Sequence, residues 1–224
     1  MTVLFVIATI ILFLAADWLL ERRKAREGRA AAIPAVRPTA DSYPVRVPDG
    51  IFFAPSHTWL NLYPSGTLRL GIDDFIARLV GHPEIILLKN AGDQVAKGDP
   101  IMLIKEDDHL LTVRSPLSGE ILEVNEALPR NPTYLKERLF GDGWGYSIKP
   151  VAMSDLKQMM LGSESRSWVR GEFGRLRNYF ASLSTDGRLQ PAYLQDGGTP
   201  AAGVLGGMDD QAWQGFEQEF LQVH

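Results

Sequence analysis

The chain has 224 residues, a formal net charge of −4 and no cysteine. This length suits one sizeable domain with appendages, or two small domains. The acidic balance argues against non-specific nucleic-acid binding, which needs a cationic face. The absence of cysteine excludes a disulfide framework, a thiolate metal site and a thiol nucleophile.

The N-terminal residues predict a transmembrane helix over 2–20. Asp17 is the only charged residue in this run, and a helix of this length spans roughly 28 Å, close to the ~30 Å hydrocarbon core of a bilayer. Basic residues follow the run and none precedes it; they are Arg22, Arg23, Lys24, Arg26 and Arg29. The positive-inside rule therefore predicts a single-pass protein of the inner or plasma membrane, with its N-terminus outside and its folded domain in the cytoplasm. A cleavable signal peptide is the alternative, but it would carry its basic residues before the apolar run.

The rest of the chain divides into three further segments. Residues 21–43 are rich in Ala, Pro and Arg, which predicts a basic tether. Residues 44–152 hold closely spaced short strands between Gly and Pro turns, a pattern typical of a small barrel or sandwich. The expected strands lie at 68–72, 85–88, 101–104, 110–113 and 120–124, and Asp73 is expected to cap a short helix at 74–79.

Residues 153–224 predict a helical C-terminal extension. One helix is expected at 164–180, and a last one begins at Asp209 and Asp210, acidic residues suited to a helix N-terminus. The last helix carries an apolar stripe at helical spacing: Trp213, Phe216, Phe220 and Leu221. This stripe could pack on a partner or on the protein's own core, and the sequence leaves both open.

A set of motifs in the middle of the chain occurs in the order and spacing of a known family. They are His57-Thr-Trp59, Leu70-Gly-Ile-Asp-Asp-Phe75, the turn from Gly92 to Pro100, the run from Ser115 to Leu128, Asn131-Pro132, and Gly141-Asp-Gly-Trp144 with the stretch ending at Pro150. Over roughly residues 50 to 160 the chain resembles the H protein of the glycine cleavage system, the lipoyl-bearing shuttle. The resemblance implies a mainly β fold, the barrel-sandwich hybrid of lipoyl and biotinyl domains, here with an N-terminal transmembrane helix and C-terminal helices.

The resemblance also implies where lipoate would be attached. In that family a lysine at a hairpin tip carries lipoate as an amide, and the spacing between Pro100 and Pro116 puts Asp108 at that position. A carboxylate cannot be acylated by a lipoyl ligase, since the reaction needs an amine. The nearest lysine is Lys105, about 10 Å away along a strand and on the opposite face. We therefore expect no lipoate and no other cofactor, with Lys105 as the alternative attachment site.

The predicted tip is acidic. Glu106, Asp107 and Asp108 precede His109, and this cluster could contact a partner, bind a divalent cation weakly, or form a solvated turn. No two of the four histidines have the spacing of a local metal motif, so no metal site is expected. For His57 we expect a packing role or a surface contact.

Together these features predict a non-catalytic, membrane-anchored accessory or scaffold subunit of a larger membrane complex, rather than an enzyme. Its expected partners are integral membrane subunits, and lipids around the N-terminal helix. The expected partner contacts are Glu106, Asp107, Asp108, His109, Trp213, Phe216 and Phe220. The alternative is a membrane-tethered lipoyl carrier, modified at Lys105, of a glycine-cleavage-like system.

Overall fold

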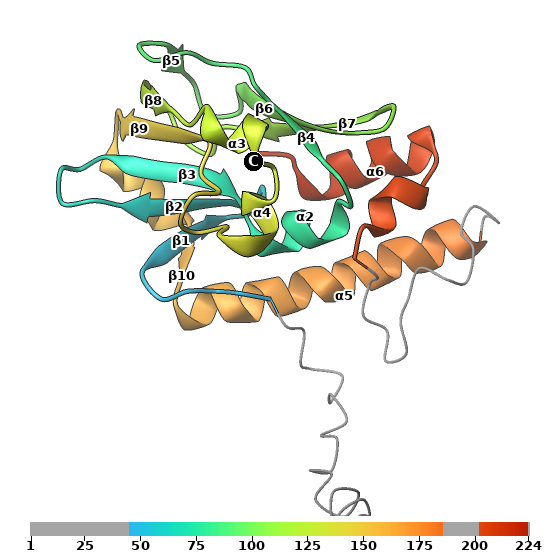
Figure 1. Cartoon of the computed structure of the whole chain (residues 1–224). Helices are drawn as coiled ribbons and strands as arrows, with labels where there is room; N and C mark the ends of the chain where they lie inside the picture. Colours follow the sequence, from blue (N-terminus) through green and yellow to red (C-terminus); the bar gives the residue numbers. More distant parts are fainter. Residues whose placement is uncertain (1–44, 186–201, 224) are drawn as a thin grey trace, which may run out of the picture. The chain divides into compact units, whose positions relative to one another are not determined.

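Two antiparallel sheets form the centre of the described part of the chain, which is residues 45–185 and 202–223 of a computed structural model (Figure 1). The larger sheet has the strand order β10-β1-β2-β3-β9-β8-β5, and the smaller has the order β4-β6-β7. The strands are β1 (Ile51–Ala54), β2 (Thr58–Leu62), β3 (Leu68–Ile72), β4 (Glu84–Leu87), β5 (Gln94–Val95), β6 (Pro100–Glu106), β7 (His109–Arg114), β8 (Gly119–Val124), β9 (Tyr146–Pro150) and β10 (Met160–Leu161). The predicted mainly β fold with C-terminal helices is therefore confirmed. The predicted transmembrane helix at 2–20 and the tether at 21–43 lie outside the described residues.

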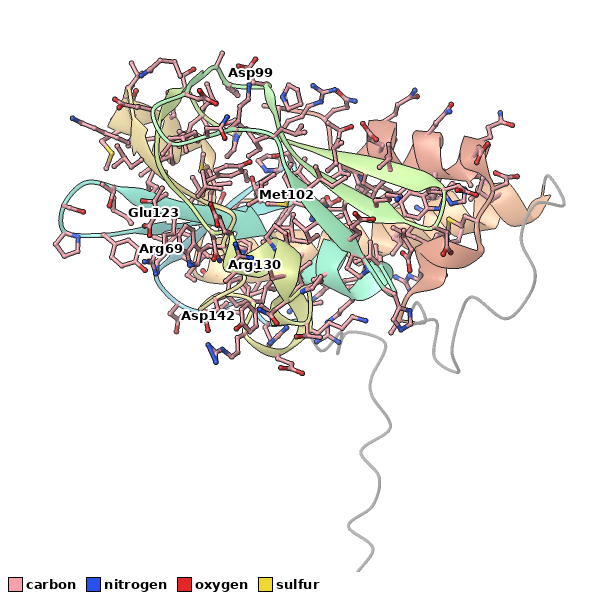
Figure 2. All side chains as sticks on the ribbon, turned by 45° about the horizontal axis from the view of Figure 1, so that its top comes forward. Arg69, Asp99, Met102, Glu123, Arg130 and Asp142 are labelled. Atoms are coloured by element: carbon pink, nitrogen blue, oxygen red, sulfur yellow. The ribbon has the colours of Figure 1, made fainter. Side chains whose placement is uncertain are left out.

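Apolar side chains that alternate along the strands fill the space between the two sheets. In β3, Leu68 and Leu70 are fully buried while Arg69 between them is partly exposed, as expected for a strand with one face in the core. Met102 of β6 lies in the interior in Figure 2 and is fully buried. The Tyr146 hydroxyl of β9 donates to the Ile101 carbonyl of β6 at 2.6 Å, so a buried hydrogen bond also joins the sheets.

Helices pack against both sheets. They are α2 (Asp74–Leu79), α3 (Ala127–Arg130), α4 (Tyr134–Glu137), α5 (Ser163–Thr185) and α6 (Asp210–Phe220), with 3-10 turns η1 (Met153–Gln158) and η3 (Val204–Gly207). The predicted caps are confirmed, because the Asp73 carboxylate accepts from the Ile76 amide and the Asp209 carboxylate accepts from the Ala212 amide. None of the helices within 45–185 and 202–223 is both long and apolar enough to cross a membrane.

The C-terminal helices share one core with the sheets. Phe75 of α2 contacts Phe173 of α5 and Phe220 of α6, with ring centroids 5.0 and 5.7 Å apart. Figure 1 shows α6 between α5 and the β6–β7 hairpin. The sequence left open whether the stripe of α6 packs on a partner or on the chain itself, and the structure buries Trp213, Phe216 and Phe220 in the chain's own core.

This packing predicts that α6 is required for stability. Phe216→Ala removes a fully buried ring, and we expect it to lower the free energy of unfolding by about 3–5 kcal/mol. Gln214→Ala, on the exposed face of the same helix, should change it by less than about 0.5 kcal/mol. Urea unfolding of the full chain measures both values, and equal small effects would show that α6 is not part of the cooperative unit.

Candidate functional site at the hairpin tip

The β6–β7 hairpin ends in a two-residue turn. Glu106 pairs with His109 at the ends of the two strands, and Asp107 and Asp108 form the turn between them. Asp107 has a φ of 53°, in the left-handed region that Asp tolerates better than most residues. Both turn aspartates are exposed, so the tip presents two carboxylates to solvent.

Glu106 does not belong to this exposed pair, which corrects the predicted cluster of three carboxylates. Its side chain is only 6% exposed, and its Oε1 accepts from the backbone amides of Gly81 and His82 at 2.7 and 2.9 Å. A Cβ on Gly206 of η3 would lie 3.2 Å from the same oxygen. Glycine avoids this tight contact where the chain passes close to the carboxylate. Glu106 therefore fastens the base of the turn to the loop that follows α2.

His109 joins the other side of the tip to α6. Its ring stacks on Trp213 with centroids 5.0 Å apart and planes 5° apart, and its Nε2 lies 3.0 Å from the Asp210 carboxylate. The Trp213 indole in turn donates to the Leu205 carbonyl of η3 at 2.9 Å. The hairpin tip is thus packed against α6 and η3.

Further along the hairpin, α6 also covers the edge of the smaller sheet. β7 is the outer strand of that sheet, and its Thr112 amide donates to the Glu217 carboxylate of α6 at 3.2 Å. An edge strand with free amides can pair with another chain, and a covering helix prevents this. The structure therefore brings together the residues at the tip and on α6 that were expected to contact a partner. They lie mainly against each other.

Lys105, the alternative lipoate site, lies on β6 with its amine 3.1 Å from the Glu84 carboxylate of β4. Its side chain is 43% exposed. Asp108 at the exposed turn offers only a carboxylate. The tip therefore presents no unpaired amine in the part of the chain that the structure describes.

A buried charged group that the sequence did not predict is centred on His57. His57 is fully buried, with its Nδ1 2.7 Å from Asp73 Oδ2 and its Nε2 3.5 Å from Glu172 Oε2. Its ring stacks on Phe75 at 4.2 Å. The predicted surface contact of His57 is wrong, because the side chain is fully buried. The predicted packing role is incomplete, because the ring also lies between the carboxylates of Asp73 and of Glu172 on α5. No local motif could reveal this, since Glu172 lies far along the chain from His57.

The two carboxylates change the pKa of His57. Burial by itself lowers that pKa, but the charge and hydrogen bond of Asp73, together with the nearby charge of Glu172, outweigh it and raise the pKa to about 9. Burial also pushes the pKa of Glu172 upward, yet His57 and Arg175 hold it below its ordinary value. Arg175 continues the chain of charges to Glu219 of α6 at 2.7 Å. His57 is therefore a cation at neutral pH, and it holds the sheet, α5 and α6 together.

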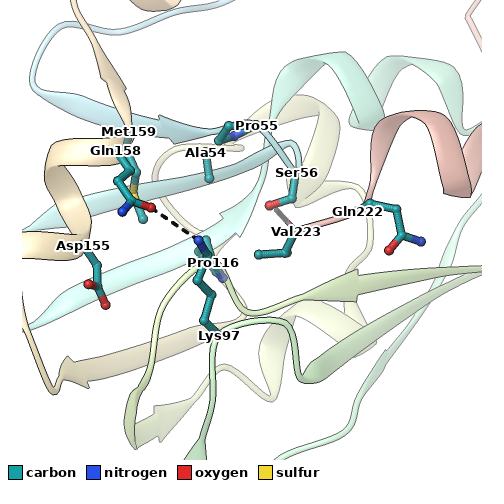
Figure 3. Close-up of a pocket in the computed structure, with 10 residues that line it drawn as sticks. All are labelled: Ala54, Pro55, Ser56, Lys97, Pro116, Asp155, Gln158, Met159, Gln222 and Val223. Atoms are coloured by element: carbon teal, nitrogen blue, oxygen red, sulfur yellow. Dashed lines mark hydrogen bonds between the residues drawn. The ribbon is translucent and has the colours of Figure 1, made fainter.

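A small hollow lies where the C-terminal residues meet the larger sheet (Figure 3). Lys97 donates to the Gln158 side chain across it at 3.3 Å. It is lined by Ala54, Pro55, Ser56, Lys97, Pro116, Asp155, Gln158, Met159, Gln222 and Val223. Its volume of about 60 Å³ leaves room for a few water molecules rather than for a cofactor. Within 45–185 and 202–223 no group of three His, Asp or Glu side chains is placed to hold a metal ion.

Comparison with known proteins connects this architecture to one family. The model of the family described as "Glycine cleavage H-protein" matches residues 51–171, more than half of the chain. The glycine cleavage system H protein of Psychrobacter sp. (strain PRwf-1) is 32% identical over 118 residues, which cover 53% of this chain and 94% of the relative. The probable glycine cleavage system H protein of Thermococcus kodakarensis is 32% identical over 126 residues, covering 56% of this chain and 93% of the relative. The crystal structure of a glycine cleavage system H protein from Mycobacterium marinum aligns with a TM-score of 0.47 and 23% identity, covering 56% of this chain and 99% of that one.

The family match ends at residue 171, just before Glu172 of the buried charge cluster. β6 and β7 lie inside the matched residues, whereas most of α5, η3 and all of α6 lie beyond them. The segment that covers the hairpin tip is therefore an addition to the matched region.

The buried His57 predicts a specific pH dependence of stability. Its pKa in the folded chain, about 9, lies above the ordinary value of 6.5. The protonated ring therefore stabilises the fold fully below pH 6.5, and this contribution is lost as the pH rises through 9. His57 has a φ of 58°, in the left-handed region that Asn also tolerates. We expect His57→Asn to be less stable than the wild type by on the order of a few kcal/mol below pH 6.5.

Urea unfolding at one pH below 6.5 and one above 9 measures this difference, which should shrink at the higher pH. His82→Gln, at an exposed position, is the matched control and should follow the wild type at both pH values. A difference between wild type and His57→Asn that does not change with pH would contradict the charged state of His57.

Proposed function

Because this chain belongs to the glycine cleavage H-protein family but has Asp108 at its packed hairpin tip, we propose that it is a non-catalytic, protein-binding member rather than a lipoyl carrier. More specifically, the protein would serve as an accessory or scaffold subunit of a membrane complex. The observation that carries it is the contact of the tip with α6, in which His109 stacks on Trp213.

Chemistry at the tip supports the loss of the carrier role. Attaching lipoate as an amide needs a nucleophilic amine, and a carboxylate such as that of Asp108 cannot supply one. The hairpin lysine, Lys105, is paired with Glu84 at 3.1 Å and lies on a strand rather than in the turn. These residues do not fit lipoate, so we assign no step that passes through it.

Packing at the tip supports the same conclusion independently. A swinging arm has to leave its domain and visit other proteins, which requires an accessible tip. Here the base of the turn is fixed by the Glu106 carboxylate, and its flank is covered by α6. The tip is therefore built as a fixed surface, whose exposed groups are Asp107 and Asp108.

The membrane part of the proposal rests on sequence alone. A predicted helix at 2–20, followed by basic residues, would place the H-protein-like domain on the cytoplasmic side. A domain held in this way would meet integral membrane subunits repeatedly, at a high effective concentration. Since Trp213, Phe216 and Phe220 are buried, the partner surface would use other side chains, with Asp107 and Asp108 as the candidates.

Purification from native membranes tests the scaffold proposal. We expect the full chain, gently solubilised, to co-purify with integral membrane subunits in a stable complex. Asp107→Asn with Asp108→Asn should weaken this association without unfolding the chain, because both side chains are exposed. Glu123→Gln, an acidic residue outside the hairpin that is also exposed, is the control. A chain that always elutes alone would contradict the proposal.

The lipoyl carrier modified at Lys105 is the second candidate, favoured by the 43% exposure of that side chain. Intact-mass measurement of natively expressed protein separates the two functions. We expect the unmodified mass for the wild type and no lipoyl increment. An increment that disappears in Lys105→Arg but persists in Lys97→Arg would establish the carrier instead.

A further inference from the structure

A cationic site lies away from the acidic hairpin tip, where α2 and α4 meet the first described residues. Here a hollow of about 250 Å³ is lined by Arg46, Asp74, Ala77, Arg78, Leu135, Lys136 and Ala202. Three of these side chains are positive and one is negative, so the hollow has a formal excess of positive charge. No local sequence motif indicates this hollow, because its residues come from separate segments.

The buried carboxylate of Asp74 holds both arginines in place. Asp74 is 1% exposed, and its Oδ1 accepts from Arg46 Nε and Nη2 at 2.9 and 2.7 Å. Its Oδ2 accepts from Arg78 Nε at 2.7 Å and from the Arg46 backbone amide at 3.0 Å. Both carboxylate oxygens are therefore occupied, and the two guanidinium groups are fixed in orientation.

The arginines retain hydrogen-bonding capacity at the hollow. Asp74 is bonded to Arg78 only through Nε, and in the described part of the chain no acceptor contacts the two terminal nitrogens of Arg78 or Nη1 of Arg46. The two side chains are 40% and 41% exposed. Charged N–H groups thus remain available to a ligand from solvent.

Lys136 completes the site and extends it. Its amine donates to the Gly81 carbonyl, and its own carbonyl accepts from Arg46 Nη2 at 2.9 Å. Lys136 also lines a neighbouring hollow of about 250 Å³, formed with Gly81, His82, Pro83, Pro132 and Thr133. This neighbouring hollow has room for the rest of a ligand whose anionic group is bound by the arginines and Lys136.

We propose that Arg46, Arg78 and Lys136 form a binding site for a phosphate group. Planar guanidinium groups match phosphate oxygens through paired N–H bonds, and lysine adds a point charge. Because Asp74 already orders both arginines, less side-chain entropy is lost on binding. The phosphate can belong to a soluble compound or to a lipid headgroup. The lipid source rests on the predicted anchor, which ends at residue 20 and leaves Arg46 within about 90 Å of extended chain.

Calorimetric titration of the full chain with inorganic phosphate tests the site. We expect binding by the wild type and a loss of about tenfold or more in affinity for Lys136→Gln or Arg78→Gln. Lys136→Gln leaves the Asp74 ion pairs intact, so it tests the site even if Arg78→Gln unfolds. Arg130→Gln on α3 (Figure 2), whose exposed side chain pairs with Glu126, removes the same charge elsewhere and should bind phosphate like the wild type.

Vesicle flotation identifies the source of the phosphate. If phosphatidic acid added to phosphatidylcholine vesicles recruits wild type and Arg130→Gln more than Lys136→Gln, the ligand is a lipid headgroup. If all three float equally while Lys136→Gln still binds inorganic phosphate more weakly, the ligand is a soluble phosphate compound. The proposal is overturned if the wild type neither binds phosphate nor floats better than Lys136→Gln, or if Lys136→Gln and Arg78→Gln match it in both assays. Neither result bears on whether the chain carries lipoate.

Discussion

The buried pairing of His57 with Asp73 and Glu172 joins the β-rich part of this protein to its C-terminal helices. Removing three charged groups from water is costly, and the cost is offset only when the groups are close and hydrogen-bonded. Asp73 lies 2.7 Å from the ring, and Glu172 is held in turn by Arg175. Aromatic rings surround the imidazole, with Phe75 stacked on it at 4.2 Å. The position of α5 therefore depends on electrostatic as well as apolar contacts.

The buried charge cluster is connected to the hairpin tip through α5 and α6. Arg175 of α5 reaches Glu219 of α6, and α6 in turn places Trp213 against His109. The helix lies along β7 and covers its outer edge. The flank of the tip is thus covered by a segment beyond the matched residues 51–171, while Asp107 and Asp108 stay exposed. A fixed tip is consistent with a domain whose role is to bind other proteins.

Two adjacent aspartates at the start of α2 serve different purposes. Asp73 caps the helix and pairs with His57, whereas Asp74 orders Arg46 and Arg78 at the surface hollow. The first aspartate contacts the buried His57, and the second contacts the arginines that line the hollow. Neighbouring residues at one helix N-terminus therefore stabilise the interior and orient the arginines of the proposed phosphate site.

The sequence by itself determined the elements whose causes are local. Helix caps at Asp73 and Asp209, the strand at 68–72 and the turn at Asp107 and Asp108 depend on neighbouring residues, and the ordered motifs indicated the family. Only the tertiary structure decided what is buried: Trp213 and its stripe entered the chain's own core, and Glu106 turned inward to two backbone amides. It also brought Glu172 to His57 and Arg46 to Asp74. The physical reason is that burial and ion pairing depend on which distant segments meet, and periodicity along one segment carries no information about its neighbour in space.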